Sequence, residues 1–435
     1  MRIVHYIPDF GFGGIQKGGC VLAASMAKMG HEVQVIGRAG GLRYEENLGS
    51  NLSHRVLDGE KTEALVNVIL EYAPDVLHIH QSTYNEVLVA QLSDSLATKC
   101  PTLVTSPVFG RPPKQFSTLN RTQTCCVGVY SFYRMCKWLN ISMEQAVKLG
   151  IGYVPITPLE PCSLNILAND APETVAARRS ELGITKDAFI VGRIARNTTS
   201  KWHSDSEVLI ETLLSRSPKI VWLSVGYPDE LGRERLQSKW GKRFCNFPQT
   251  ADYNFLCQVL ACMDVQVFFS RHGECFASTI CEAAGIGVPT IGLCTPLTDN
   301  GQSEQIVEGV TGMLINSIEG AIKAVESLLD SPVTLAKLKA STHKYAYDKW
   351  HVDRVSTNLL ELYLFWISGN RKKSDYVAQM QREYAEFADN YRQRVAKLMG
   401  TNPLSHTLWL GLTAAVESWS IFCMGRSLKQ VLQRT

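Results

Sequence analysis

The chain switches repeatedly between two hydrophobic periods, and this alternation limits the folds open to it. Short apolar runs, typical of buried parallel strands, are separated by longer segments with helical spacing in both halves of the sequence. Strands joined through helices predict a parallel, doubly wound sheet. Because 435 residues are too many for one ordinary core, we expect two such α/β domains.

The first series predicts a Rossmann-like domain over residues 1–158. Its expected strands are Ile3–Ile7, Val33–Ile36, Val76–His80, Thr102–Thr105 and Val127–Val129, and its expected helices are Gln16–Met29 and Glu63–Tyr72. Prolines then interrupt every regular period between Val154 and Ala171, which indicates a connector between domains.

The second series predicts another Rossmann-like domain over residues 159–350. Its expected strands are Phe189–Ile194, Ile220–Val225, Val265–Ser270 and Thr290–Leu293, and its expected helices are Ser206–Leu214, Asp252–Met263, Glu319–Leu329 and Val333–Tyr347. The pattern is helical from Val352 onward, so we expect residues 351–435 to form a helical C-terminal extension. Open α/β sheets bind ligands at the carboxyl ends of their strands, and we expect the site there.

The composition is that of a globular protein, with 45% apolar and 20% charged residues. A net charge of +3 offers little attraction for nucleic acid, so no such partner is expected. The 13 cysteines are odd in number and scattered, which favours reduced thiols over a disulfide framework. The start has no signal-peptide pattern, and polar residues interrupt the best candidate span, Leu404–Gly425, so we expect a cytoplasmic protein.

Two glutamates, Glu274 and Glu282, frame a short segment that follows an apolar run and opens a helix. Their spacing places them two helical turns apart on nearly one face, about 12 Å from end to end. That reach suits a ligand as long as a sugar nucleotide, with one acid at sugar hydroxyls and the other at the ribose diol. The backbone N–H groups of the helix start, between the two acids, can hold a phosphate.

Two loops add further groups that suit an anion. Arg193 ends a predicted strand and is followed by Arg196 and Lys201, a pattern suited to a diphosphate and also found in ordinary basic surface loops. The glycines of Gly11–Gly14 let the backbone approach an anion closely. Their spacing is not that of a dinucleotide-binding fold, so no redox cofactor is expected.

Histidines suggest either a substrate contact or a metal. His272 lies in the loop before Glu274, where it could orient a substrate or simply be solvated. His78 and His80 share one face of a predicted strand. Because no third ligand at convincing spacing accompanies them, we favour a structural His78 and a cleft-facing His80 over a zinc site. We expect no metal at the diphosphate either, since basic groups and helix starts can neutralise it.

Taken together, these motifs resemble the GT-B nucleotide-sugar glycosyltransferases, specifically the retaining glycosyltransferase family 4 group. The resemblance covers about Met1–Tyr363. It is carried most specifically by Glu274–Glu282 and Gly285–Gly292, with support from Gly13–Gly14, Gly30–Val33, Asp75–His80, Gly192–Arg193, Lys201, Glu304–Gly312 and Trp350–Tyr363.

The resemblance implies a GT-B fold, in which two Rossmann-like domains face a cleft. Residues 1–158 would be the acceptor side and residues 159–350 the nucleotide-sugar side. Glu274 would contact the hydroxyls of the donor sugar, while Arg193 and Lys201 would grip the diphosphate, and His80 is the remaining catalytic candidate. The donor-binding set implied in this way is Gly13, Gly14, Arg196, His272, Ser278, Thr279, Ile280 and Glu282.

The chain departs from the family pattern on the acceptor side. Many relatives carry a histidine after the strand that here reads Thr102–Thr105, whereas this chain continues with Ser106–Arg111. Either His80 or backbone carbonyls would take over that work, or the acceptor site is built differently. The phenylalanine-glycine pair usual after the first acid appears here as Phe276 and Ala277.

The activity implied is metal-independent hexosyl transfer from a nucleoside-diphosphate sugar to a hydroxyl acceptor with retention. The donor is a substrate, so no cofactor is expected. The setting expected from the family is bacterial surface-polysaccharide or glycolipid synthesis, with a saccharide or lipid-linked saccharide as acceptor. A sugar-nucleotide epimerase on the same plan and a non-catalytic GT-B-fold binding protein are the alternatives.

The sequence leaves several roles open for the C-terminal extension, residues 351–435. Arg371–Lys373 and the aromatic residues after Leu404 suit peripheral contact with the inner face of the cytoplasmic membrane. Packing within a dimer or a helical cap on the enzyme explains the same residues.

Overall fold

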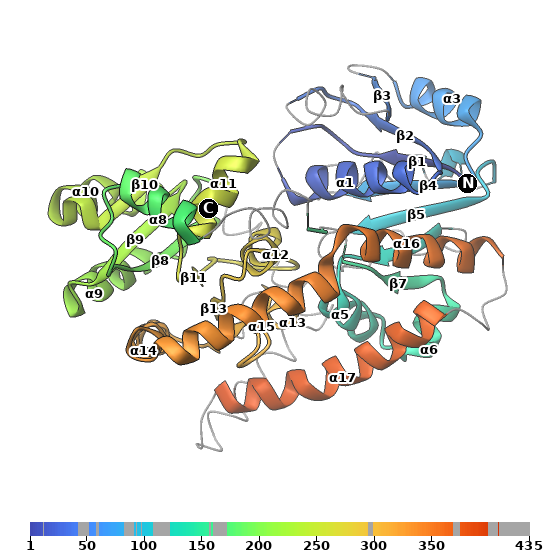
Figure 1. The fold of residues 1–435 in the computed structure, drawn as a ribbon. Coiled ribbons are helices and arrows are strands. Elements are labelled where there is room, and N and C mark those ends of the chain that lie inside the picture. The colour runs from blue at the N-terminus through green and yellow to red at the C-terminus, as the bar shows by residue number, and fades with distance from the viewer. Residues whose placement is uncertain are drawn as a thin grey trace, which may run out of the picture. The chain divides into compact units, whose positions relative to one another are not determined.

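The chain forms two compact units in the computed structural model (Figure 1). Unit 1 contains Met1–Pro158 together with Val352–Arg394, and unit 2 is built mainly from Leu159–His351. The residues that the structure describes are 1–11, 13–41, 52–57, 61–81, 91–92, 94–96, 98–107, 122–155, 158–159, 172–294, 299–368, 375–398 and 408.

Unit 1 is built on a seven-stranded parallel sheet with the order β3-β2-β1-β4-β5-β6-β7. Its strands are β1 (Arg2–Tyr6), β2 (Glu32–Gly37), β3 (Ser53–Val56), β4 (Val76–Gln81), β5 (Thr102–Pro107), β6 (Thr122–Cys126) and β7 (Ile151–Tyr153). Its helices include α1 (Gly14–Lys28), α3 (Thr62–Tyr72), α5 (Val129–Leu139), α6 (Met143–Lys148), α16 (Val352–Ile367) and α17 (Asp375–Leu398).

Alternate residues along the unit 1 strands enter two separate cores. Ile3 of β1 packs with side chains of α1 and α16, whereas Val4 packs with side chains of α3. This is the period of two expected for a strand whose faces are both covered by helices. Figure 1 shows α1 and α16 running together over the same side of the sheet.

Unit 2 is built on a six-stranded parallel sheet with the order β10-β9-β8-β11-β13-β15. Its strands are β8 (Phe189–Ile194), β9 (Ile220–Val225), β10 (Phe244–Phe247), β11 (Val265–Phe268), β13 (Thr290–Leu293) and β15 (Gly312–Ile315), and β12 (Gly273–Glu274) pairs separately with β14 (Asp299–Asn300). Its α-helices include α8 (Pro172–Glu181), α9 (Ser206–Arg216), α10 (Arg233–Trp240), α11 (Tyr253–Ala261), α12 (Ser278–Gly285), α13 (Gln302–Gln305), α14 (Ile318–Asp330) and α15 (Pro332–Trp350).

The predicted α/β class is confirmed, since both sheets are parallel and their strands alternate with helices. β8 and β9 are buried along their whole length, which explains why both read as continuous apolar runs. The predicted strand Val127–Val129 is wrong. The strand is β6, which ends at Cys126, and Val129 begins α5 after the N-cap Gly128. The apolar pattern missed β6 because threonines and cysteines fill it, although threonine favours strands.

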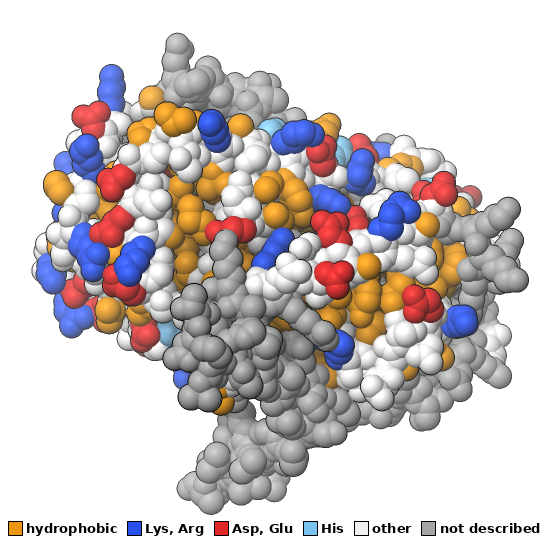
Figure 2. All heavy atoms as spheres, turned by 90° about the horizontal axis from the view of Figure 1, so that it is seen from below, with side chains coloured by type: hydrophobic (Ala, Val, Ile, Leu, Met, Phe, Trp, Pro, Cys, Tyr) orange, Lys and Arg blue, Asp and Glu red, His pale blue; other side chains and the backbone are white. Residues whose placement is uncertain are grey.

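Within the predicted helical extension, residues 351–435, the structure contains α16 and α17. The part of this extension after Leu398 lies outside the described residues, apart from Leu408. Among the helices that the structure describes, none has both the length and the apolar character needed to cross a membrane. Lysine, arginine, aspartate and glutamate side chains are intermixed on the face shown in Figure 2, in keeping with the small net charge.

Candidate functional site

The carboxyl edge of the unit 2 sheet carries most of the predicted site residues. The strand order reverses between β8 and β11, which are hydrogen-bonded neighbours. In doubly wound sheets such a reversal opens the crevice in which ligands bind. Arg193 lies near the end of β8, and β11 leads into the loop that carries Glu274. The fold therefore brings these two distant sequence motifs to one place.

Arg193 is a buried cation that does not use all of its hydrogen-bonding capacity. It is 1% exposed, its Nη2 donates to the carbonyl of Lys201 at 2.5 Å, and its guanidinium lies 4.9 and 4.7 Å from the ring centroids of Trp202 and Phe268. Its Nε and Nη1 have no hydrogen-bond partner among the described residues. Burial lowers the pKa of Arg193 to about 9 against the opposing effect of the Glu274 charge, so the side chain is a cation at neutral pH. Unpaired donor groups on a buried cation are suited to an anionic ligand.

Lys201 and Glu274 form an ion pair beside Arg193. Lys201 Nζ lies 2.5 Å from Glu274 Oε1, and the two side chains are 28% and 17% exposed. Three of the four predicted catalytic residues thus form one cluster, in which Lys201 pairs with Glu274 and Arg193 hydrogen-bonds to the backbone of Lys201. A partly exposed pair of this kind can exchange its internal contact for a ligand that offers both hydroxyls and phosphate oxygens.

Trp202 holds the basic loop in place, and the sequence analysis did not single it out. Its buried ring covers the Arg193 guanidinium, and its indole N–H donates to the carbonyl of Arg196 at 3.1 Å. One side chain therefore contacts both Arg193 near the end of β8 and Arg196 at the start of the basic loop. The available signal was its place directly after Lys201 in an otherwise polar loop.

The backbone around Glu274 is held by a two-residue parallel ladder between β12 and β14. Glu274 pairs with Asn300, and the N–H of Gly301 donates to the Glu274 carbonyl at 2.7 Å. Gly273 has a φ of +69°, and a Cβ added there would lie 1.7 Å from the carbonyl oxygen of Asp299. Only glycine fits at this position, so the approach of the chain to Glu274 depends on it.

The helix α12 begins directly after this loop with the N-cap Ala277, which has no side-chain oxygen to cap it. The first-turn N–H groups of Ser278 and Thr279 therefore receive no side-chain cap and are suited to an anion. Glu282 lies in the second turn and is buried. Only Ser278–Gly285 is helical, so the helical estimate of about 12 Å does not apply to the interval from Glu274 to Glu282.

The remaining predicted donor contacts are spread over both units. Arg196 is exposed, and His272 is exposed with its carbonyl accepting from the N–H of Asp299 at 3.0 Å. Gly13 and Gly14 begin α1 in unit 1, where Gly13 is the N-cap and adopts a φ of +155°. Their contact with a donor stays a prediction.

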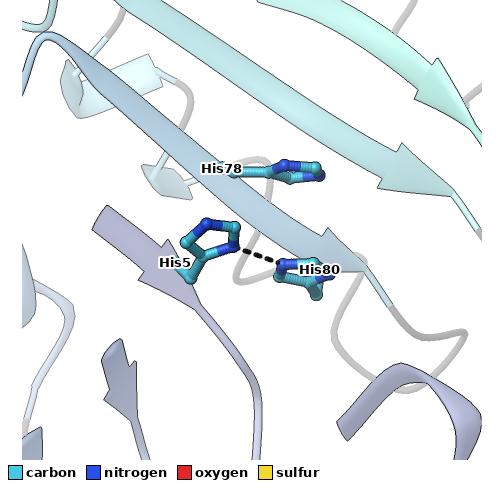
Figure 3. Close-up of side chains that lie close together, drawn as sticks. All are labelled: His5, His78 and His80. Atoms are coloured by element: carbon cyan, nitrogen blue, oxygen red, sulfur yellow. Dashed lines mark hydrogen bonds between the residues drawn. The ribbon is translucent and has the colours of Figure 1, made fainter. Parts of the chain in front are cut away.

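His80 is enclosed inside unit 1 and does not lie at an open edge as the sequence analysis expected. It is 1% exposed, and a Cβ added to Gly19 of α1 would lie 3.2 Å from its Nε2. Its Nε2 lies 2.9 Å from Nδ1 of His5 (Figure 3). His78 hydrogen-bonds to the hydroxyl of Tyr363. His80 is as buried as Arg193, and its catalytic role stays a prediction.

The third histidine, His5, is the one that the sequence analysis did not find. It faces His78 directly in the register of β1 with β4, and His80 follows two positions later on the same face. The predicted strands could not reveal this pairing, because they lacked β3 and made Val76–His80 the third strand, whereas a doubly wound order places the fourth strand beside the first.

The histidine cluster does not have the geometry of a metal site. Its candidate ligand atoms lie within 4.8 Å of one another, yet the rings of His78 and His80 stack at 4.4 Å with planes only 8° apart (Figure 3). Lone pairs in parallel ring planes point side by side, whereas a bound zinc requires them to converge. His5 and His80 also share a hydrogen bond already. The arrangement fits neutral, hydrogen-bonded imidazoles, and the acceptor-side loop at 108–111 lies outside the described residues.

Comparison with known proteins identifies the fold. No protein-family model matches the chain, and no curated protein sequence does. Solved structures match over most of it. A glycosyltransferase from Rickettsia africae has 17% identity and a TM-score of 0.67, with 86% of this chain and 99% of that chain covered.

Two further solved structures agree with this match. HepE from Anabaena in complex with UDP has 18% identity and a TM-score of 0.65 over 83% of this chain and 99% of that one. The sucrose-phosphate synthase of Thermosynechococcus elongatus has 17% identity and a TM-score of 0.63 over 85% and 99%. The predicted resemblance to GT-B glycosyltransferases is therefore confirmed at the level of the fold.

Proposed function

We propose that this chain is a retaining glycosyltransferase that moves a hexose from a nucleoside-diphosphate sugar to a hydroxyl acceptor. The observation that carries the proposal is the cluster of Arg193, Lys201 and Glu274 at the strand reversal of unit 2, beside the uncapped start of α12. Since the similar HepE structures contain UDP or UDP-glucose, a UDP-sugar is the first donor to test.

In this proposal the basic groups bind the negatively charged diphosphate of the donor, and the two glutamates bind its hydroxyls. Negative charge develops on the leaving diphosphate during transfer. The unpaired Nε and Nη1 of Arg193, the Lys201 ammonium and the first turn of α12 would stabilise it. Glu274 would give up its contact with Lys201 and accept from sugar hydroxyls, while Glu282 would accept from the ribose.

The acceptor half of the reaction rests on family analogy. We propose that the leaving phosphate takes the proton of the acceptor hydroxyl as the new bond forms. The acceptor would be a saccharide or lipid-linked saccharide of a bacterial surface-polysaccharide or glycolipid pathway, used at the cytoplasmic face of the membrane. Gly13, Gly14, Arg196 and His272 remain proposed donor contacts, and His80 remains a proposed catalytic residue.

A thermal-shift screen with UDP, GDP, ADP and their sugars tests the proposal. One nucleoside diphosphate should raise the melting temperature, since a ligand at 100 times its Kd adds about 2.7 kcal/mol. The Glu282→Ala variant is the matched control and should respond less to the same compound. If no nucleoside diphosphate stabilises the wild-type chain, the proposal is wrong.

Product analysis separates the alternatives. A glycosyltransferase releases nucleoside diphosphate and needs an acceptor for sustained turnover. An epimerase converts the sugar nucleotide without an acceptor, and a binding protein releases nothing. Detection of free diphosphate together with a lengthened acceptor is the expected result.

A further inference from the structure

We propose that Gln305 is a positioning residue that holds the first turn of α12 in place to bind the diphosphate of the donor. The inference rests on the proposed function and adds a residue to which the motifs assigned no role. Gln305 ends the short helix α13 and is 0% exposed. A fully buried amide must have its polar atoms paired, so its partners show what it holds.

The side chain of Gln305 pairs with the backbone of Ala277 in both directions. The N–H of Ala277 donates to Gln305 Oε1 at 2.8 Å, and Gln305 Nε2 donates to the carbonyl of Ala277 at 2.8 Å. Nε2 also donates to Sγ of Cys281 at 3.0 Å, one turn into α12. The acceptor and both N–H groups of the amide are thus engaged, and all three bonds end on α12 or its N-cap.

This pairing holds the N-cap residue of α12, whose first turn receives no side-chain cap. Helices usually begin with a residue whose own side chain accepts from the first turn, and Ala277 cannot do so. Gln305 fixes the N-cap from another part of the chain and leaves the N–H groups of Ser278 and Thr279 without a side-chain cap. The start of the helix is therefore both fixed and open to an anion.

The other end of α12 is held by different contacts. The carbonyl of Gly285 lies 2.9 Å from Nδ1 of His343, and a Cβ added at Gly285 would lie 2.9 Å from the Leu159 side chain. Close packing at this end does not involve Gln305. Loss of Gln305 should therefore displace the phosphate-binding start of α12 more than the turn that carries Glu282.

The full-length Gln305→Met variant tests this uneven effect. Titration calorimetry measures its affinity for UDP and for uridine, which lacks the phosphates. We expect binding of UDP to weaken roughly tenfold, because charge-assisted bonds at a helix start depend on its placement, with uridine binding unchanged. Equal losses for both ligands, or no loss for UDP, would overturn the inference.

Arg243→Met is the matched control for general destabilisation. Arg243 donates to the carbonyls of Leu214 and Ser217 at the end of α9 and of Ile220, the first residue of β9, so these bonds lie at the amino-terminal end of that strand, opposite the candidate site. Its loss removes several hydrogen bonds from unit 2 without touching α12. We expect a lower melting temperature and unchanged affinities for UDP and uridine.

Gln305→Glu is the second variant and serves if Gln305→Met does not fold. The ionised carboxylate still accepts from the N–H of Ala277 but cannot donate to its carbonyl, whereas the protonated acid can. The UDP affinity of this variant relative to wild type should therefore rise as the pH is lowered from 8 to 5.5. A flat ratio would contradict the positioning role.

Binding by the wild-type chain and binding by the Gln305 variants test different claims. If the wild-type chain binds none of UDP, GDP or ADP, the proposed function is wrong and the role of Gln305 falls with it. If the wild-type chain binds UDP and the Gln305 variants bind it equally well, only the role of Gln305 is wrong.

Discussion

Acidification from pH 7.5 to pH 5.5 is expected to destabilise unit 1 through its histidine cluster. Burial lowers the pKa of His5 to about 3, and burial together with the neighbouring histidines lowers the pKa values of His78 and His80 well below 6.5. In the unfolded chain each imidazole regains a pKa of about 6.5. The unfolded state then binds more protons below pH 6.5, so the free energy of unfolding falls as the pH falls through that value.

The size of the effect follows from the same linkage. At pH 5.5 an imidazole with a pKa of about 6.5 gains about 1.4 kcal/mol from protonation in the unfolded state, and a buried neutral ring gains none of it. At pH 7.5 the gain is below about 0.1 kcal/mol. For three rings, the free energy of unfolding therefore falls by about 4 kcal/mol between pH 7.5 and pH 5.5. This is a large share of the roughly 5–15 kcal/mol that stabilises a typical protein.

Hydrogen exchange read by mass spectrometry measures this difference for each unit separately. Peptides from β1 and β4 report unit 1, and peptides from β8 and β9 provide an internal control, after correction for the intrinsic pH dependence of exchange. His80→Gln removes one titrating ring and should reduce the pH-dependent loss by about 1.4 kcal/mol. Equal pH sensitivity of the two units, or an unchanged sensitivity in the variant, would refute the reasoning.

Three substitutions test the site in unit 2. Glu282→Ala should weaken binding of the nucleoside diphosphate by roughly tenfold or more in calorimetry, and undiminished affinity would contradict the ribose assignment. Glu274→Gln should lower the rate of diphosphate release from the sugar nucleotide by at least about 10²-fold, with equal or tighter binding of the diphosphate because Lys201 loses its carboxylate partner; a wild-type rate would contradict this role. Gly273→Ala should lower the melting temperature, at a cost of roughly 1–3 kcal/mol, since its φ is +69° and the new Cβ meets the Asp299 carbonyl; an unchanged melting temperature would show that the loop adapts.

The fold class and the central strands were predictable because the hydrophobic period follows directly from burial. β8, β9 and β13 begin and end where the apolar runs predicted them, since central parallel strands are apolar on both faces. β3, β7, β10 and β15 were not predicted. β6 was missed because its burial is achieved with threonines and cysteines, which a count of large apolar residues does not register.

The candidate site was predictable in part. Glu274, Arg193 and Lys201 were found because charged residues at strand ends stand out against apolar runs. Trp202 and Gln305 were not assigned roles, because what they do depends on neighbours far away or across a loop.

The order of residues along the chain therefore determined which segments become strands and helices and which loops carry charge, because these depend on local period and composition. Tertiary structure alone decided that His5 joins His78 and His80 inside unit 1, and that Arg193 meets Glu274 at the strand reversal of unit 2. Such pairings depend on strand order and register, which bring together residues that no local pattern connects.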